Sequence, residues 1–161
     1  VPNFSRVDET AAFWPRRQLH EVTVHVVDLL QALGRDEPQW AVPAELAADG
    51  VDEVLRVFFP RMTARGARPD VRSRIRLVAD DLDRSWVVAP AEDDSATPAL
   101  LDPTTDADAL VSGPASDLYL ALWHRVPRER LRFEGDAGAR RARLGFVGLA
   151  GSALLDGPTT P

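Results

Sequence analysis

A carboxylate, an imidazole and a second carboxylate follow one another at short intervals near the start of the chain, as Glu21, His25 and Asp28. On an α-helix, steps of four and then three residues return to the same face, so these side chains would form one polar stripe. The residues around them are largely apolar, and polar groups on a buried face are costly unless they are paired or bind a metal. The stripe is therefore the first place in this sequence to look for chemistry.

The spacing leaves two interpretations of this stripe open. Imidazole and carboxylate groups are suitable ligands for zinc or another divalent metal, and Glu21 and His25, at i and i+4, can point at one ion. Asp28 would then be a further ligand, or would orient the imidazole through a hydrogen bond. The alternative is a salt-bridged stripe in which Arg17 pairs with Glu21 one turn later. His20 projects about 100° away and is expected to be a surface or packing residue.

The composition bounds what such a site can do. The chain has 161 residues, 45% of them hydrophobic, which is enough for one domain with a core. It has no cysteine, which excludes disulfides, thiolate ligands and a cysteine nucleophile, so any thiol chemistry needs an external thiol. The net charge of −6 argues against a nucleic-acid partner, and no apolar run is long enough to span a membrane. No signal peptide is visible, and we expect a cytoplasmic protein.

The apolar pattern predicts one long helix at the start of the chain. It is expected to begin after Asp8 and to end at Gly34, with Pro15 either kinking it or marking its true start in the first turn. Its apolar residues recur at helical spacing and are expected to face a core. They are Leu19, Val22, Val26, Leu29, Leu30 and Leu33. Because a single amphipathic helix is not a domain, this face needs a partner, either the rest of the chain or another chain.

The region that follows mixes helical and β-strand patterns. A second helix is expected between Leu46 and Phe59, weakened by Gly50 and ended by Pro60. Strands are predicted near residues 72–79, 85–89, 99–101, 107–111 and 130–134, with helices over 115–124 and about 136–146. The predicted fold class is therefore α+β, with one long N-terminal helix in residues 1–35 and a mixed α/β domain in residues 44–155.

Two further features could bind anions. Arginines at positions 72, 74, 76, 130 and 132 alternate with other residues along predicted strands. They would line an anion-binding groove or form the solvated face of a sheet, and the second is favoured because all basic residues of this chain are arginine. The segment 112–116 precedes a helix, whose N-terminus can bind an anion, but Pro114 removes one donor and favours simple capping.

Several segments, taken in order, resemble a known family. The first is AFWPRRQLHEVTVHVVD at residues 12–28. The others are ADGVDE at 48–53, ADALVSGPASDLYLALWHR at 107–125 and EGD at 134–136. This series, which extends over nearly the whole chain, resembles the mycothiol-dependent maleylpyruvate isomerase family of actinobacteria. The resemblance implies the last helix of a DinB-like four-helix bundle, followed by a C-terminal domain of sterol-carrier-like fold.

The resemblance also implies site residues. Glu21 and His25 match the family's Glu-x-x-x-His ligand pair for a metal, typically zinc, and Asp28 matches a position to which we assign a supporting role. The family's third ligand is a histidine on an earlier helix, which would precede Val1. Arg125 is the candidate catalytic residue, as a contact to substrate or thiol, with a structural role at a helix end as the alternative. His124 stands where the family usually has a small residue.

Two functions follow as hypotheses. The first is a zinc- and mycothiol-dependent isomerase or thiol transferase that acts on a small-molecule substrate, with part of its metal site outside this chain. The second is a non-catalytic module that binds a small molecule or an apolar ligand, held between the sheet and the helix at 118–123. We expect no nucleic-acid or membrane partner, and a homodimer through the first helix would cover its apolar face. The chain alone is expected to have little or no isomerase activity.

Overall fold

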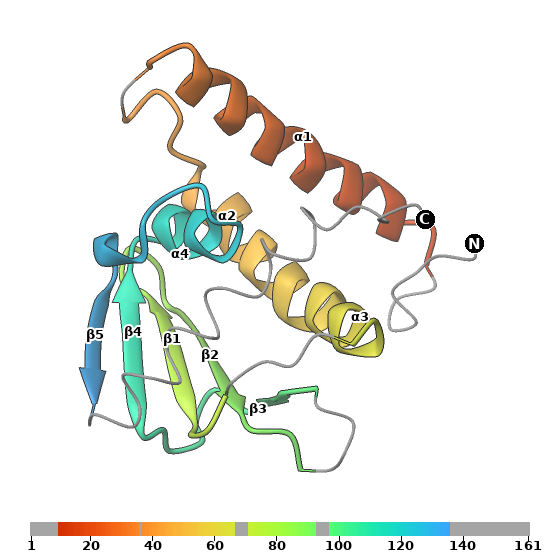
Figure 1. Ribbon diagram of the computed structural model, residues 1–161, viewed down its shortest axis with the longest axis vertical. Coiled ribbons are helices and arrows are strands. Elements are labelled where there is room, and N and C mark those ends of the chain that lie inside the picture. Colours follow the sequence, from red (N-terminus) through yellow and green to blue (C-terminus); the bar gives the residue numbers. More distant parts are fainter. Residues whose placement is uncertain (1–9, 36, 67–70, 93–96, 136–161) are drawn as a thin grey trace.

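The computed structural model describes residues 10–35, 37–66, 71–92 and 97–135. A long helix, α1, crosses a layer of helices that in turn covers a five-stranded sheet (Figure 1). Helices precede the first strands, and a further helix is inserted between the last two strands. The predicted α+β fold class is therefore confirmed.

Helix α1 extends over Phe13–Ala32. Pro15 lies in its first turn, where a proline costs no helical hydrogen bond, so the second interpretation of this residue is confirmed. Gly34 follows the helix with φ +66°, the left-handed conformation typical of a residue just after a helix end. The expected cap at Asp8 falls outside the described residues.

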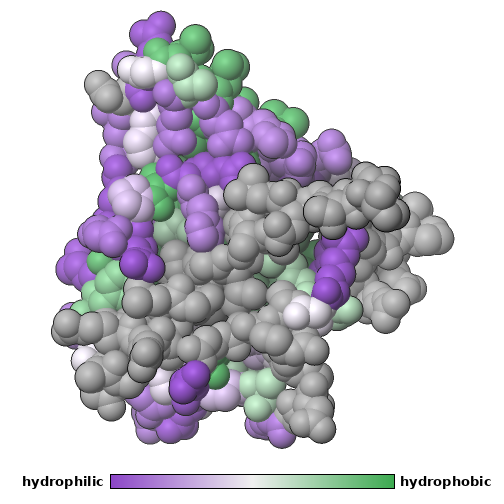
Figure 2. Space-filling model, viewed as in Figure 1, coloured by the Kyte–Doolittle hydropathy of each residue, from purple (hydrophilic) through white to green (hydrophobic). Residues whose placement is uncertain are grey.

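The buried face of α1 is not the one that its apolar pattern predicts. Its buried residues are Phe13, Arg17, His20, Val24 and Val27. Of the six predicted core residues, Leu30 is partly buried, and the other five are between 47% and 64% exposed, namely Leu19, Val22, Val26, Leu29 and Leu33. Figure 2 shows apolar residues along the upper edge of the molecule, where α1 lies. The prediction that this stripe faces a core is wrong within the described part of the chain, because acidic residues of α2 hold the opposite face of α1.

The second helix is longer than predicted and changes its winding. Helix α2, Ala44–Glu53, continues into a π-helical turn, Val54–Phe58, and then into α3, Phe59–Ala64. Pro60 lies in the first turn of α3 rather than at the end of the helix, so the prediction that it ends the helix is wrong. The π-helical turn already interrupts the regular hydrogen-bond ladder before Pro60, and the missing N–H of the proline therefore costs little.

The sheet has the strand order β3-β2-β1-β4-β5. Its strands are β1, Ile75–Ala79; β2, Arg84–Ala89; β3, Ala99–Leu101; β4, Ala109–Gly113; and β5, Arg132–Gly135. Strands β1 and β4 are parallel, and the other pairs are antiparallel. The predicted alternation along β1 is confirmed, since Ile75, Leu77 and Ala79 are buried and the residues between them are not.

Helix α4, Ala115–Leu122, lies between α1 and the sheet and is buried over its whole length. Its Tyr119 ring packs directly on Gly50 of α2, where a side-chain carbon would come within 2.4 Å of the ring. At the first residue of this helix, the Ala115 N–H donates a hydrogen bond of 2.9 Å to the carboxylate of Asp81. The helix predicted over about 136–146 lies outside the described residues. None of the described helices combines the length and the apolar character needed to cross a membrane.

Candidate functional site

The stripe on α1 forms a chain of contacts centred on His25. The Nε2 atom of His25 lies 3.2 Å from Oε1 of Glu21, and its Nδ1 lies 3.2 Å from Oδ2 of Asp28. The His25 side chain is 63% exposed, so the stripe lies on the surface of α1 rather than on its buried face. The i, i+4 and i, i+3 spacing thus brings the three side chains together as predicted.

The two contacts of His25 cannot both be hydrogen bonds of a neutral ring. A neutral imidazole has one N–H, whereas an ionised carboxylate only accepts hydrogen bonds. If Nδ1 donates to Asp28, then the Nε2 lone pair faces Glu21 Oε1 with no hydrogen between them. The close approach of two such acceptor atoms is favourable only when a proton or a metal ion lies between them. Two ligands of a tetrahedral zinc ion, each ~2.0–2.2 Å from the metal, lie ~3.3 Å apart, which is close to the observed separation.

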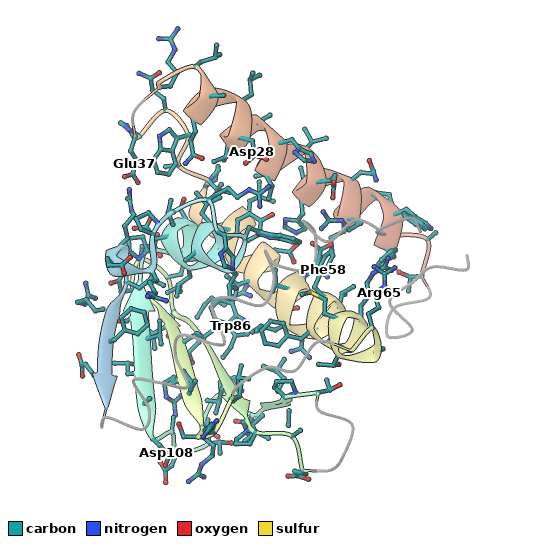
Figure 3. The ribbon with its side chains drawn as sticks, in the orientation of Figure 1. Asp28, Glu37, Phe58, Arg65, Trp86 and Asp108 are labelled. Carbon is teal, nitrogen blue, oxygen red and sulfur yellow. The ribbon has the colours of Figure 1, made fainter. Side chains whose placement is uncertain are left out.

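Arg125 joins this stripe from the end of α4. Its Nε and Nη2 atoms donate to the two oxygens of Asp28 at 2.8 and 3.0 Å, a bidentate pair, and Asp28 projects from α1 toward α4 (Figure 3). The hydrogen bonds from Arg125 hold the pKa of Asp28 below its ordinary value. His124, just before Arg125, has φ 58°, a left-handed conformation that favours glycine. The turn at His124 directs the chain so that Arg125 returns to α1.

Arg17 joins the stripe to α2 from the buried side. Its guanidinium donates to Glu21 Oε2 and to Glu53, and it lies over the rings of Phe58 and Trp123, at 4.9 and 5.8 Å from their centres. Arg17 is 5% exposed and Glu53 is 1% exposed. Burial raises the pKa of Glu53 to about 7, against the opposing effect of Arg17. The Arg17–Glu21 pair that the salt-bridge interpretation predicted is therefore present.

These side chains surround one small pocket of about 30 Å³. It is lined by Arg17, Glu21, Val24, His25, Trp123 and Arg125. The structure thus brings Arg125 to the same pocket as Glu21 and His25, although α4 is distant from α1 in sequence. Both arginines of the pocket already have carboxylate partners, and Glu21 Oε1 faces His25 Nε2.

His20 is buried behind this site and is a packing residue rather than a surface residue. Its Nε2 lies 2.7 Å from Asp49 Oδ2, and its Nδ1 lies 3.4 Å from the Tyr119 hydroxyl. Burial lowers the pKa of His20, against the opposing effect of Asp49. Arg16 donates to the same carboxylate at 2.9 Å. These contacts, together with Arg17–Glu53, attach the polar face of α1 to α2.

Sequence analysis missed Arg17, Glu53 and Asp49 as a group. Glu53 and Asp49 lie in the ADGVDE segment at residues 48–53, yet no local spacing connects them to α1. Arg17 lies on the face of the first helix opposite its predicted apolar stripe, so the hydrophobic pattern carries no signal that this arginine is buried. Within the described ranges no group of three His, Asp or Glu side chains could hold a metal, so Glu21 and His25 are at most part of a metal site.

Of the five arginines predicted on strands, only Arg76 and Arg132 lie on strands, because β1 begins at Ile75 and Arg130 ends a 3₁₀ turn before β5. The arginines have partners in the structure. Arg76 donates to the carbonyls of Pro103 and Thr105, the second at 2.6 Å, and Arg74 lies 3.7 Å from Asp108. Arg130 lies 3.0 Å from Asp117, and Arg132 pairs with Asp80. These pairs favour the solvated-face interpretation over an anion-binding groove.

Comparison with known proteins places this chain in a family. No curated protein matches it. Among solved structures it is similar to one described as a UbiJ-SCP2 ubiquinone synthesis protein, with 22% identity, a TM-score of 0.45 and coverage of 71% of this chain and 98% of that one. The family model for the MDMPI C-terminal domain matches residues 45–142, more than half of the chain. The chain therefore belongs to the MDMPI C-terminal domain family.

Proposed function

We propose that this chain supplies two ligands, Glu21 and His25, to a divalent-metal site, typically zinc, in a mycothiol-dependent isomerase or thiol transferase. One observation carries the proposal: His25 Nε2 and Glu21 Oε1 face each other 3.2 Å apart on the exposed side of α1. Such a pair is suited to a cation, and imidazole nitrogen and carboxylate oxygen are both zinc ligands. The third ligand would be the histidine that the resemblance implies on an earlier helix.

The other residues of the pocket would support this site. Asp28 Oδ2 lies 3.2 Å from His25 Nδ1, and a hydrogen bond donated by Nδ1 to this oxygen would leave Nε2 free to bind a metal. Arg125 is held by Asp28 and retains a 23% exposed side chain, so its guanidinium can also contact an anionic group of a substrate. A bound zinc ion would supply the Lewis acidity that keeps a thiol ionised near neutral pH. Because the chain has no cysteine, that thiol would come from outside it.

Metal binding and turnover test the proposal separately. In a protein that includes the helix with the third ligand, we expect zinc binding in isothermal titration calorimetry, and loss of this binding in the variants Glu21→Ala and His25→Ala. Gln18→Ala, an exposed position on the same helix, is the matched control and should bind as the unmodified chain does. In a longer protein that includes the preceding helices, thiol-dependent isomerisation should depend on the same two residues.

The alternative function, a non-catalytic module for an apolar ligand, makes the opposite prediction. It requires that zinc binding be absent, or that it persist unchanged in both the Glu21→Ala and the His25→Ala variants. Either result would show that Glu21 and His25 are not metal ligands. The chain would still belong to the MDMPI C-terminal domain family, but the proposed metal-binding role would be lost.

A further inference from the structure

The two halves of α1 are attached to the rest of the molecule in different ways. In the N-terminal half, Arg17 donates to Glu53 of α2, and His20 Nε2 lies 2.7 Å from Asp49 Oδ2. Arg16 donates to the same Asp49 carboxylate at 2.9 Å. Arg17, His20 and Glu53 are all buried. Several charged side chains, most of them shielded from water, therefore anchor this half of α1 on α2.

The C-terminal half of α1 is attached at Arg125. Within the described part of the chain, its polar contacts with the rest of the fold come from Asp28 and Gln31, and both are made with this one residue. The Arg125 guanidinium donates to Asp28 at 2.8 and 3.0 Å, and Gln31 Nε2 donates to the Arg125 carbonyl at 2.9 Å. The Asp28 and Arg125 side chains are 36% and 23% exposed, so water competes for their ion pair. This attachment is therefore weaker than the anchor on α2.

The pocket lies between α1 and the end of α4, and it is too small for a ligand in the present arrangement. One wall is formed by α1 and the other by Trp123 and Arg125. Its volume of about 30 Å³ has room for roughly two water molecules, whereas pockets for small molecules measure about 300 Å³ or more. A small molecule can therefore enter only if α1 and the end of α4 move apart.

We propose that α1 is a lid: its N-terminal half stays anchored on α2, and its C-terminal half opens from the pocket when the Arg125–Asp28 ion pair separates. The buried residues of this half are Val24 and Val27, so opening exposes little apolar surface. Opening also frees the guanidinium of Arg125 to bind an anionic group of a ligand. This motion concerns access to the pocket and requires no metal, and it therefore goes beyond the proposed function.

Thiol labelling tests the opening directly, because the chain has no cysteine of its own. Val27→Cys places a thiol on the inner face of the lid and Val111→Cys places one in β4, at positions that are 2% and 1% exposed. With a maleimide reagent, we expect the Val27→Cys protein to be labelled at least about tenfold faster, since local opening is more frequent than global unfolding. Adding Ile75→Val, which weakens the sheet, should raise labelling about fivefold in the Val111→Cys protein only. Equal labelling rates, or a rise in both proteins, would overturn the lid.

Two further substitutions locate the moving half. Asp28→Asn removes the ion pair with Arg125 and should raise labelling of the Val27→Cys protein about threefold. Asp49→Asn is the matched control in the anchored half, and it should leave this rate unchanged because its contacts persist in the open state. An unchanged rate with Asp28→Asn, or an equal rise with Asp49→Asn, would contradict a lid that opens at Arg125. If Val27→Cys prevents folding, as circular dichroism would show, Val24→Cys on the same face replaces it.

Discussion

At the scale of single residues, His25 has a carboxylate at each ring nitrogen, and each carboxylate is held by a different arginine. Glu21 is held by Arg17 and Asp28 by Arg125. Bonds between charged donors and acceptors are the stronger ones in proteins, so the imidazole is oriented through its partners although its own side chain is exposed. The orientation of His25 consequently depends on residues from the ends of α2 and α4.

The first prediction concerns Asp28. The substitution Asp28→Asn removes the carboxylate that His25 Nδ1 and Arg125 share, and we expect zinc affinity to fall about tenfold. Thermal stability should change little, because the Asp28–Arg125 pair is partly exposed. Asp52→Asn, which removes the partner of Arg56 in a separate ion pair, is the control for calorimetry. Zinc affinity equal to that of the unmodified chain would show that Asp28 does not orient the ligand.

The second prediction concerns the pH dependence of stability at Glu53. Burial raises the pKa of this carboxyl from 4.5 to about 7, so the folded state keeps its proton at a pH where the unfolded state has lost it. The stabilisation from the protonated form is therefore complete below 4.5 and is lost as the pH rises through 7. Glutamine cannot lose a proton, and Glu53→Gln should gain stability relative to the unmodified chain over this range.

Chemical denaturation of both proteins at several pH values between 4.5 and 8 measures this difference. We expect the free energy of unfolding of the variant, minus that of the unmodified chain, to rise by at least about 1 kcal/mol across the range. Contributions from His20 cancel because that residue is present in both proteins. A difference that is flat with pH would mean that Arg17 keeps Glu53 ionised at all of these pH values.

At the scale of elements, sequence patterns predicted the features that depend only on neighbouring residues, namely the ends of a helix and the alternation of a strand. The position of Pro15 in the first turn of α1, the end of α1 before Gly34 and the alternation of β1 are all present in the structure. The buried face of α1 was not predictable from its own residues, because Glu53, the partner that draws Arg17 inward, lies on α2. The passage of the helix through Pro60 depends on a π-helical turn, for which the sequence has no local signal.

The third prediction belongs to the contact between α2 and α4. The Gly50→Ala substitution would place a carbon 2.4 Å from the Tyr119 ring, and the helices would have to separate. We expect a loss of about 1–3 kcal/mol in the free energy of unfolding, as for overpacked cores. Gly34→Ala is the comparison, since nothing lies within 4 Å there and only its φ of +66° opposes a side chain. Denaturant melts in which Gly50→Ala is no less stable than the unmodified chain would contradict the close packing.

At the scale of the whole molecule, α1 is the outermost of the described helices (Figure 1). Its inner face combines Arg17 and His20 with apolar residues, and its outer face carries an apolar stripe. The outer stripe of Leu19, Val22, Val26, Leu29 and Leu33 is exposed. Its spacing of three and four residues in alternation is the a and d pattern by which helices pack side by side. An exposed apolar stripe of this kind is a feature of interaction surfaces.

The last prediction is that two copies of this chain associate through α1. Each stripe would then cover the other, and the exposed leucine and valine side chains would be removed from water. Light scattering after size-exclusion chromatography should show a dimer whose proportion increases with protein concentration. Val22→Glu/Val26→Glu places two charges at the centre of the stripe and should give a monomer, whereas Ala41→Glu, at an exposed position outside α1, should not. A chain that stays monomeric at all concentrations would contradict self-association, and the stripe would then need a helix of a different sequence as its partner.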